Sequence, residues 1–144
     1  MNDFLARLQN GGLLFDGSMG ALIEARGVTT NCPALLNAEN PALIRAIHQD
    51  YRAAGADVSI ANTFGANPIK LRALGLENRL DELIEKGVAL AREAGNFALL
   101  DIGPTGEFLR PAGNIGLEEM VQVFRACAQA GARAGADGII IETM

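Results

Sequence analysis

The stretch GADGIIIETM, residues 135–144, contains a short apolar run that ends on the carboxylate of Glu142. Residues 138–141 are apolar at successive positions, as in parallel strands that are covered by helices. Gly135 comes just before this run, where a helix that precedes a strand needs a flexible residue to end it. The stretch therefore predicts a helix end, a parallel strand and a polar group at the carboxyl end of that strand.

Three similar runs precede this one along the chain. They are GLLFD at 12–16, DVSIAN at 57–62 and FALLD at 97–101, and with GIIIE at 138–142 they recur about every forty residues. Each run is brief and rich in Leu, Ile, Val or Phe. We therefore expect four parallel strands.

Helical patterns alternate with these runs. Three stretches have apolar residues at helical spacing: 40–54, 79–94 and 117–133. Asn40 followed by Pro41 is typical of a helix start, and a further helix is expected over 2–9. This alternation predicts an α/β fold with right-handed crossovers in a single unit, 1–144. Two architectures fit: an open doubly wound sheet, or an (αβ)4 unit that supplies four of the eight strands of a TIM (β/α)8 barrel.

The composition excludes several classes of function. The chain has 144 residues, of which 49% are hydrophobic and 20% charged, and its net charge is -5. Its 12 Lys and Arg residues are scattered, so we expect no surface for nucleic acid or an anionic membrane. No apolar run approaches the roughly 20 residues that span a bilayer, and the first residues lack the features of a signal peptide. A cytoplasmic location is therefore the expectation.

Polar residues stand at the carboxyl ends of the predicted strands. They are Asp16, Asn62 with Thr63, Asp101 and Glu142. In both architectures ligands bind at this edge of the sheet. Asp and Asn also cap turns, so any one of them alone has a structural explanation. Together, the three carboxylates would repel phosphate and favour a ligand with a cationic group such as an α-amine.

The loops exclude two common ligands, and the remaining candidate residues have structural explanations. No loop contains G-x-G-x-x-G or G-x-x-x-x-G-K-[ST], so neither a dinucleotide nor a nucleoside triphosphate is indicated. His48 falls beside the apolar stripe of its helix and away from the strand ends, which predicts a structural or exposed histidine. Cys127 takes a core position of its helix, and Cys32 lies in a loop without a neighbouring His or Lys. Their number and spacing predict reduced thiols.

Five motifs in register carry a family resemblance. LLFDGSMGALIEARG, NCPALLN, IHQDYRAAGADVSIANTFGAN, DIGPTGEFL and GADGIIIETM resemble successive motifs of the homocysteine S-methyltransferase family, which includes cobalamin-dependent methionine synthase and betaine-homocysteine methyltransferase. The likeness runs in order over nearly the whole chain and is closer to the methionine synthase side.

The resemblance implies a TIM barrel in which three cysteine thiolates hold zinc at the carboxyl ends of the strands. Zinc there binds and deprotonates the thiol of homocysteine, which is needed because a free thiol, with a pKa of about 8.5, is mostly protonated at neutral pH. The thiolate takes a methyl group from methylcobalamin, methyl-folate, betaine or a sulfonium donor, and methionine results. The sequence does not identify the donor.

The resemblance also implies roles for the residues at the strand ends. Asp16 and Glu142 match the two carboxylates that hold the amino group of homocysteine. The backbone amides around Gly17 and Ser18 match the loop beside its carboxylate. The other three residues at the predicted strand ends match the rim near the sulfur and zinc: Asn62, Thr63 and Asp101.

Two departures from the family pattern stand out. Ala21 replaces the Thr that usually follows D-G-x-M-G, which removes one hydroxyl. The zinc cysteines belong to the second half of the family's barrel and have no counterpart in these 144 residues. The resemblance thus implies zinc in the complete barrel and none bound by this chain, and the isolated chain is expected to be inactive.

Three arrangements would complete such an amino-terminal half-barrel. In the first, the sequence is an excerpt of a longer enzyme. In the second, it is one subunit of a split enzyme. In the third, two copies pair to close eight strands. The main expectation is the homocysteine-binding half of a methyltransferase that works once a zinc-bearing half completes it. The alternatives are a catalytically inactive, self-associating half-barrel and an open-sheet binding module for a small amino acid.

Overall fold

Three parallel strands form the sheet of the computed structural model, which describes residues 3–95 and 97–144. The strands are β1 (Val58–Ile60), β2 (Phe97–Ile102) and β3 (Gly138–Ile141), and they lie in the order β1-β2-β3. Residues 12–16 run beside β1 on its other side. The spatial order therefore follows the chain order, as in a barrel, without the reversal that marks a doubly wound sheet.

The first predicted strand, 12–16, is reduced to a single bridge between Phe15 and Val58. Leu14 O and the amide of Asp16 pair with β1 as in a parallel ladder. The next amide, that of Ile60, donates instead to the side-chain oxygen Oδ2 of Asp16 at 3.0 Å. The prediction of a regular strand at 12–16 was thus wrong, because the Asp16 carboxylate takes the place of the backbone acceptor and ends the ladder. The segment nevertheless runs parallel to β1.

Four helices lie where they were predicted, the last three of them from their apolar periodicity. They are α1 (Asp3–Gly11), α4 (Pro41–Ala53), α6 (Leu80–Glu93) and α7 (Leu117–Arg133). The predicted start at residue 2 lies outside the described residues. Asn40 caps α4 by accepting the Leu43 amide, as the Asn-Pro pair predicts. No helix of the described chain is both long and apolar enough to cross a membrane.

Several shorter helical segments were not predicted. They are α2 (Met19–Ala25), η1 (Pro33–Leu35), α3 (Leu36–Glu39), α5 (Pro68–Ala73) and η2 (Glu77–Arg79). Each is too short to show a clear apolar period. Ser18 caps α2 and Asn67 caps α5, each by a side-chain oxygen that accepts an amide three residues later. The capping residues Ser18 and Asn67 were therefore the sequence features that could have indicated α2 and α5.

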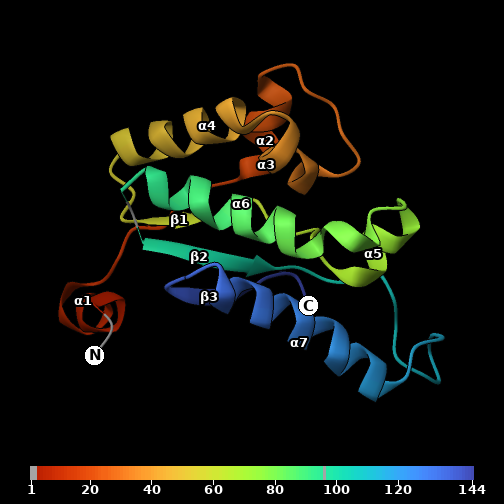
Figure 1. Cartoon of the computed structure of the whole chain (residues 1–144). Helices are drawn as coiled ribbons and strands as arrows, with labels where there is room; N and C mark the ends of the chain where they lie inside the picture. The colour runs from red at the N-terminus through yellow and green to blue at the C-terminus, as the bar shows by residue number, and fades with distance from the viewer. Residues whose placement is uncertain (1–2, 96) are drawn as a thin grey trace.

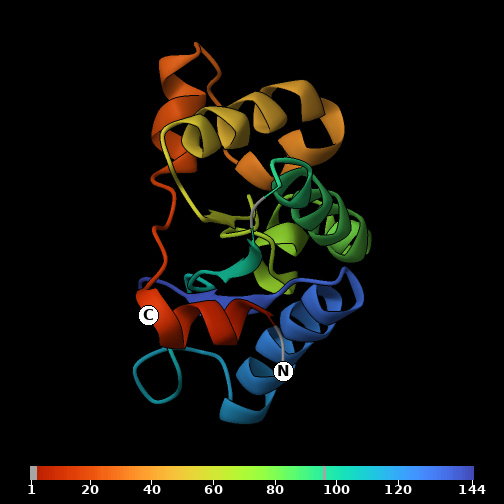
Figure 2. The ribbon, with the colours of Figure 1, turned by 90° about the vertical axis from the view of Figure 1, so that its left-hand side faces the viewer.

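The two faces of the sheet pack against different helices. Helices α4, α6 and α7 follow one another around the outer side of the strands, from the top of the view to its lower right (Figure 2); Figure 1 labels them. Leu100 of β2 packs there in a core with Ile84 of α6 and Cys127 of α7. On the other face, Phe4 of α1 packs with Leu99 and Val58, in a cluster that covers the amino-terminal part of the sheet. Figure 2 shows α1, in red, next to β3. The carboxyl end of this inner face is left for polar residues.

Buried Asn37 joins α3 to the loop after β1 and to α6. Its amide nitrogen donates to the carbonyl oxygens of Asn62 and Leu83, at 2.9 and 3.0 Å. Gly87 of α6 makes this approach possible, since a Cβ there would lie 2.6 Å from Asn37 Nδ2 and 3.0 Å from Thr63 Cγ2. The close contact between α3 and α6 supports the loop that follows β1.

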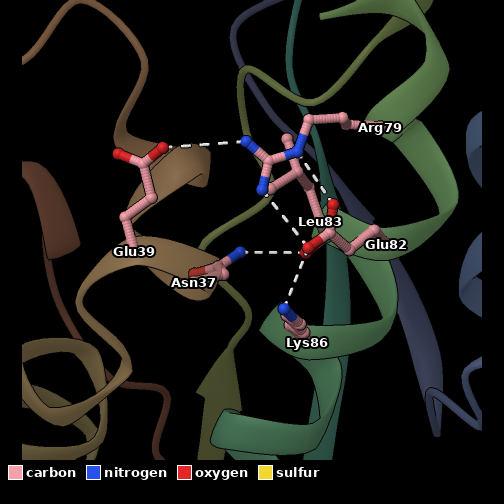
Figure 3. A network of polar contacts seen from close by, with 6 residues as sticks. All are labelled: Asn37, Glu39, Arg79, Glu82, Leu83 and Lys86. Carbon is pink, nitrogen blue, oxygen red and sulfur yellow. Dashed lines mark hydrogen bonds and ion pairs between the residues drawn. The ribbon is translucent and has the colours of Figure 1, made fainter.

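Surface charges extend the same junction (Figure 3). Arg79 donates to Glu82 from Nε at 2.8 Å, and Lys86 donates to it at 2.9 Å. Arg79 also lies 3.7 Å from Glu39 of α3. The hydrogen bonds from Arg79 and then from Lys86 lower the pKa of Glu82 to about 2. These charged side chains are partly or fully exposed to solvent, so their contacts contribute to local order more than to stability.

Gly87→Ala should destabilise the chain by about 1–3 kcal/mol, because the new methyl group overpacks the contact with Asn37. Urea unfolding followed by circular dichroism measures this loss. Gly20→Ala is the matched control, since Gly20 is also helical and a Cβ there meets nothing within 4 Å. Equal stability of the two variants would contradict the packing argument.

Candidate functional site

A cavity of about 540 Å³ opens at the carboxyl ends of the strands. Six of the seven predicted site residues line it: Asp16, Gly17, Ser18, Asn62, Asp101 and Glu142. The remaining lining residues come from the same loops and strand ends: Met19, Gly20, Pro33, Ile60, Ala61, Phe64 and Thr143. Sequence segments far apart in the chain thus meet at one site, as the parallel strands require.

Thr63, the seventh predicted residue, does not line the cavity. Its hydroxyl accepts the amide of Asp101 at 3.0 Å and donates to the carbonyl oxygen of Asp101 at 2.9 Å. The side chain is therefore engaged between the ends of β1 and β2, where it is 1% exposed. Thr63 thus fixes the backbone that carries Asp101, and its contact with a ligand stays a prediction.

Asn62 lines the cavity, but its amide hydrogens have internal partners. Nδ2 donates to the carbonyl oxygen of Pro33 at 2.7 Å and to Oδ1 of Asn37 at 2.9 Å. These two bonds tie the loop after β1 to the segment around Pro33. Asn62 therefore shapes the wall of the cavity and has no amide hydrogen left for a ligand.

The loop 16–18 is held from both sides. Asp16 accepts the Ile60 amide, and Ser18 Oγ accepts the Ala21 amide at 3.2 Å as the cap of α2. Gly17 lies against Tyr51 of α4, because a Cβ on Gly17 would come within 2.9 Å of the Tyr51 hydroxyl. Glycine is thus required at this position by close packing, and the loop sits rigidly above the strand ends.

Glu142 follows directly after β3. Its amide donates to the carbonyl oxygen of Ile102 at 3.1 Å, which extends the pairing with β2 by one residue. Side chains alternate along a strand, so Glu142 shares the inner face with Ile140 and Asp101. Thr143 then turns the chain with a φ of 60°, a conformation that β-branched residues rarely adopt.

Three carboxylates converge on the cavity. The pKa of Asp101 is raised to about 7 from its ordinary value of 3.8, first by burial and then by repulsion from Glu142 and Asp16. Oδ1 of Asp16 and Oδ1 of Asp101 are buried without a hydrogen-bond partner among the described residues. The site therefore carries more negative charge and more free acceptors than its own donors satisfy, which suits a cationic ligand.

His48 and Tyr51 are site neighbours that the sequence analysis did not identify. The structure contradicts the prediction that His48 is away from the strand ends: it is fully buried, and its Nδ1 lies 3.7 Å from Oδ2 of Asp16. The helical spacing could have indicated that His48 and Tyr51 face inward, because positions 44, 47, 48 and 51 form one stripe of α4. The apolar neighbours in that stripe concealed a polar contact that only the packing of α4 against 16–18 creates.

Neither of the two cysteines lines the cavity. Both Cys32 and Cys127 are buried in the core between the sheet and its helices. Burial raises the pKa of the Cys127 thiol to about 11, so it is not a thiolate at neutral pH. Within 3–95 and 97–144, no group of three or more His, Cys, Asp or Glu side chains is arranged to hold a metal ion. These residues do not fit a zinc centre.

Comparison with known proteins identifies the family. A sequence profile described as homocysteine S-methyltransferase matches residues 13–144. The chain belongs to this family. The methionine synthase of Mycobacterium tuberculosis (strain ATCC 25618 / H37Rv) is 29% identical over 157 residues, covering 98% of this chain and 13% of that protein. The homocysteine S-methyltransferase of Escherichia coli (strain K12) is 40% identical over 108 residues, covering 72% of this chain and 34% of that protein.

A solved structure of the family extends the likeness to the fold. The metallated form of the homocysteine methyltransferase MmuM from Escherichia coli superposes with a TM-score of 0.84 and 31% identity. The match covers 99% of this chain and 58% of that one. The predicted TIM-barrel architecture is therefore confirmed, and the chain spans only part of the length of these homocysteine methyltransferase relatives.

Asp101→Asn should stabilise the chain at pH 8 by an amount on the order of 1 kcal/mol, once solvent screening is allowed for. The folded pKa of Asp101, about 7, lies above its ordinary value of 3.8. Between these values the folded chain binds more protons than the unfolded chain, so this carboxyl makes stability fall as pH rises. Well above pH 7, Asp101 is ionised in the folded chain, and the full cost of burying its charge lowers the free energy of unfolding. The uncharged side chain of Asn removes this cost.

Urea midpoints of the parent and the Asp101→Asn variant at pH 4 and pH 8 measure this effect. The difference between the two proteins should grow as pH increases. Glu119→Gln removes an exposed carboxylate and serves as the control. A constant difference across this range would contradict the raised pKa.

Proposed function

We propose that this chain is the amino-terminal half of a homocysteine S-methyltransferase barrel and binds the amino-acid end of homocysteine. The observation that carries this proposal is the convergence of Asp16, Asp101 and Glu142 on one cavity. Their mutual repulsion makes the empty site unfavourable for charge, as the raised pKa of Asp101 indicates. An ammonium group placed among them would relieve that repulsion.

Asp16 and Glu142 are the proposed contacts of the ammonium group. Asp16 has a buried oxygen, Oδ1, without a donor, and Glu142 is partly exposed at the end of β3. The backbone amides around Gly17 and Ser18 border the same cavity and are the proposed contacts of the ligand carboxylate. The thiol end of homocysteine would then extend toward the side of Asn62 and Asp101.

Activation of the thiol requires groups that this chain does not place at the cavity. The family resemblance supports a zinc-bearing second half that completes the barrel and binds the homocysteine sulfur. The part proposed for this chain is to bind and orient the amino acid. The methyl donor would also be bound outside these residues, and the proposed location is the cytoplasm.

Exposed apolar residues support association with a second half-barrel. Ile139 and Ile141 of β3 are 47% and 66% exposed, and Leu14 on the opposite edge is 58% exposed. β3 pairs only with β2 among the described strands, so one of its edges is open. Open, apolar edges favour pairing with another chain. A second copy of this chain would also cover the open, apolar edge of β3, which supports a self-associating half-barrel as the alternative function.

Glu142→Gln should weaken homocysteine binding by about tenfold, because a carboxylate contact with the ammonium group is replaced by a neutral amide. Isothermal titration calorimetry with reduced homocysteine measures the Kd. The analogue 4-mercaptobutanoate, which lacks the amine, should bind the parent and the variant with equal, weaker affinity. Equal homocysteine affinity in the two proteins would remove Glu142 from the proposed site.

Light scattering tests the proposed association. At micromolar concentration the parent should show a mass above the 15.1 kDa of one chain, because the open edge of β3 is apolar. Ile141→Lys should shift the mass toward one chain, since a charged residue blocks edge pairing. Val121→Lys, on the exposed face of α7, is the control and should leave the mass unchanged. A parent monomer would argue against self-association.

A further inference from the structure

Helix α4 packs directly behind the loop that carries Asp16. Two of its side chains, His48 and Tyr51, are three residues apart and share one face of the helix. The Tyr51 hydroxyl donates to the carbonyl oxygen of Ser18 at 3.1 Å. His48 Nδ1 lies 3.7 Å from Asp16 Oδ2. The loop 16–18 therefore meets α4 at two polar points, one on each side of Gly17.

The polar atoms at the first of these points are not satisfied. Neither ring nitrogen of His48 makes a hydrogen bond with any described residue, although the side chain is fully buried. Oδ1 of Asp16 also has no donor, and the Asp16 side chain is only 1% exposed. Buried polar groups without partners are rare in folded proteins and often mark a site that a ligand completes.

The carboxylate decides which nitrogen of His48 carries the proton. A neutral imidazole has one N–H donor and one acceptor lone pair. If the proton were on Nε2, the lone pair of Nδ1 would face Oδ2 of Asp16, and the two would repel each other. A proton on Nδ1 is attracted to that oxygen instead, so the nearby carboxylate favours this form of the ring.

We propose that His48 is a positioning residue that holds the Asp16 carboxylate for the ligand ammonium. Asp16 Oδ2 accepts the Ile60 amide, and a second donor from His48 Nδ1 fixes the plane of the carboxylate. Oδ1 then remains for the ammonium group. The distance of 3.7 Å is long for a hydrogen bond, and such contacts in ligand-free sites often tighten when the ligand binds.

The second contact explains why a small movement is enough. Tyr51 holds the Ser18 carbonyl, and Gly17 lies so close to the Tyr51 ring that a Cβ would come within 3.3 Å of three ring or hydroxyl atoms. The loop therefore cannot shift far relative to α4. Closing the gap between His48 and Asp16 from 3.7 Å to an ordinary hydrogen-bond distance requires a side-chain adjustment of less than about 1 Å. The role of His48 rests on the proposed binding of an amino acid at Asp16.

The chain contains a single histidine, which allows a direct test. In a long-range proton–nitrogen NMR spectrum of ¹⁵N-labelled chain without a histidine tag, every imidazole signal belongs to His48. The expected result is a proton on Nδ1, and loss of that preference in Asp16→Ala. An unprotonated Nδ1 in the parent would overturn the proposal. This measurement does not depend on homocysteine, so it stands even if the proposed function fails.

Binding measurements test the consequence for the ligand. His48→Leu keeps a similar volume without polar atoms and should weaken homocysteine binding by about tenfold. His48→Asn keeps an amide nitrogen at the δ position and should recover most of the affinity. Binding of 4-mercaptobutanoate should not change in either variant, because it has no amine. Gln49→Ala, an exposed neighbour on α4, is the matched control.

Stability separates this role from a purely structural one. His48→Leu removes two buried nitrogens without partners, so its urea midpoint should equal or exceed that of the parent while homocysteine affinity falls. Lower stability with unchanged affinity, or equal loss of affinity for both ligands, would overturn the positioning role and leave the proposed function intact. Absence of homocysteine binding by the parent would count against the proposed function, and the NMR result would then decide whether His48 and Asp16 form the pair.

Discussion

The parallel hydrogen-bond ladder of β1, β2 and β3 is the constraint on which the site depends. Parallel strands in consecutive order bring their carboxyl ends to one edge, so residues separated by many positions in the sequence meet there. The ladder extends to Glu142, whose amide pairs with Ile102, and so places this carboxylate on the same face as Asp101. The composition of the cavity follows from this backbone pairing.

The meeting of the strand ends also brings the negative charges of Asp16, Asp101 and Glu142 together, which is unfavourable while the site holds no ligand. Asp101 is driven toward its neutral form by burial and by two nearby carboxylates. The surrounding polar groups stabilise the backbone rather than the charges, since Thr63 and Asn62 bond to main-chain and amide atoms. Such a cluster of carboxylates without neighbouring positive charges is expected at a functional site rather than in a purely structural region. A functional site here agrees with the membership of the chain in an enzyme family.

The outer helices take part in the site as well as in the core. Gly87 lets α6 approach Asn37, and Asn37 in turn bonds to Asn62 at the cavity wall. On the other side of the cavity, Gly17 lets the loop approach Tyr51 of α4. At both places the lack of a Cβ allows a helix to press against a site segment. The cavity is therefore held from behind by helices that also build the hydrophobic core.

The sequence by itself determined the features that depend on local chemistry. Apolar periodicity located α4, α6 and α7, and the residues at the strand ends indicated an acidic site. Tertiary structure decided the rest, because it depends on contacts between distant segments. The ladder at 12–16 stops where the Asp16 side chain accepts the amide of Ile60, 44 residues away. His48 belongs to the site only because α4 packs against that loop, which no local pattern specifies.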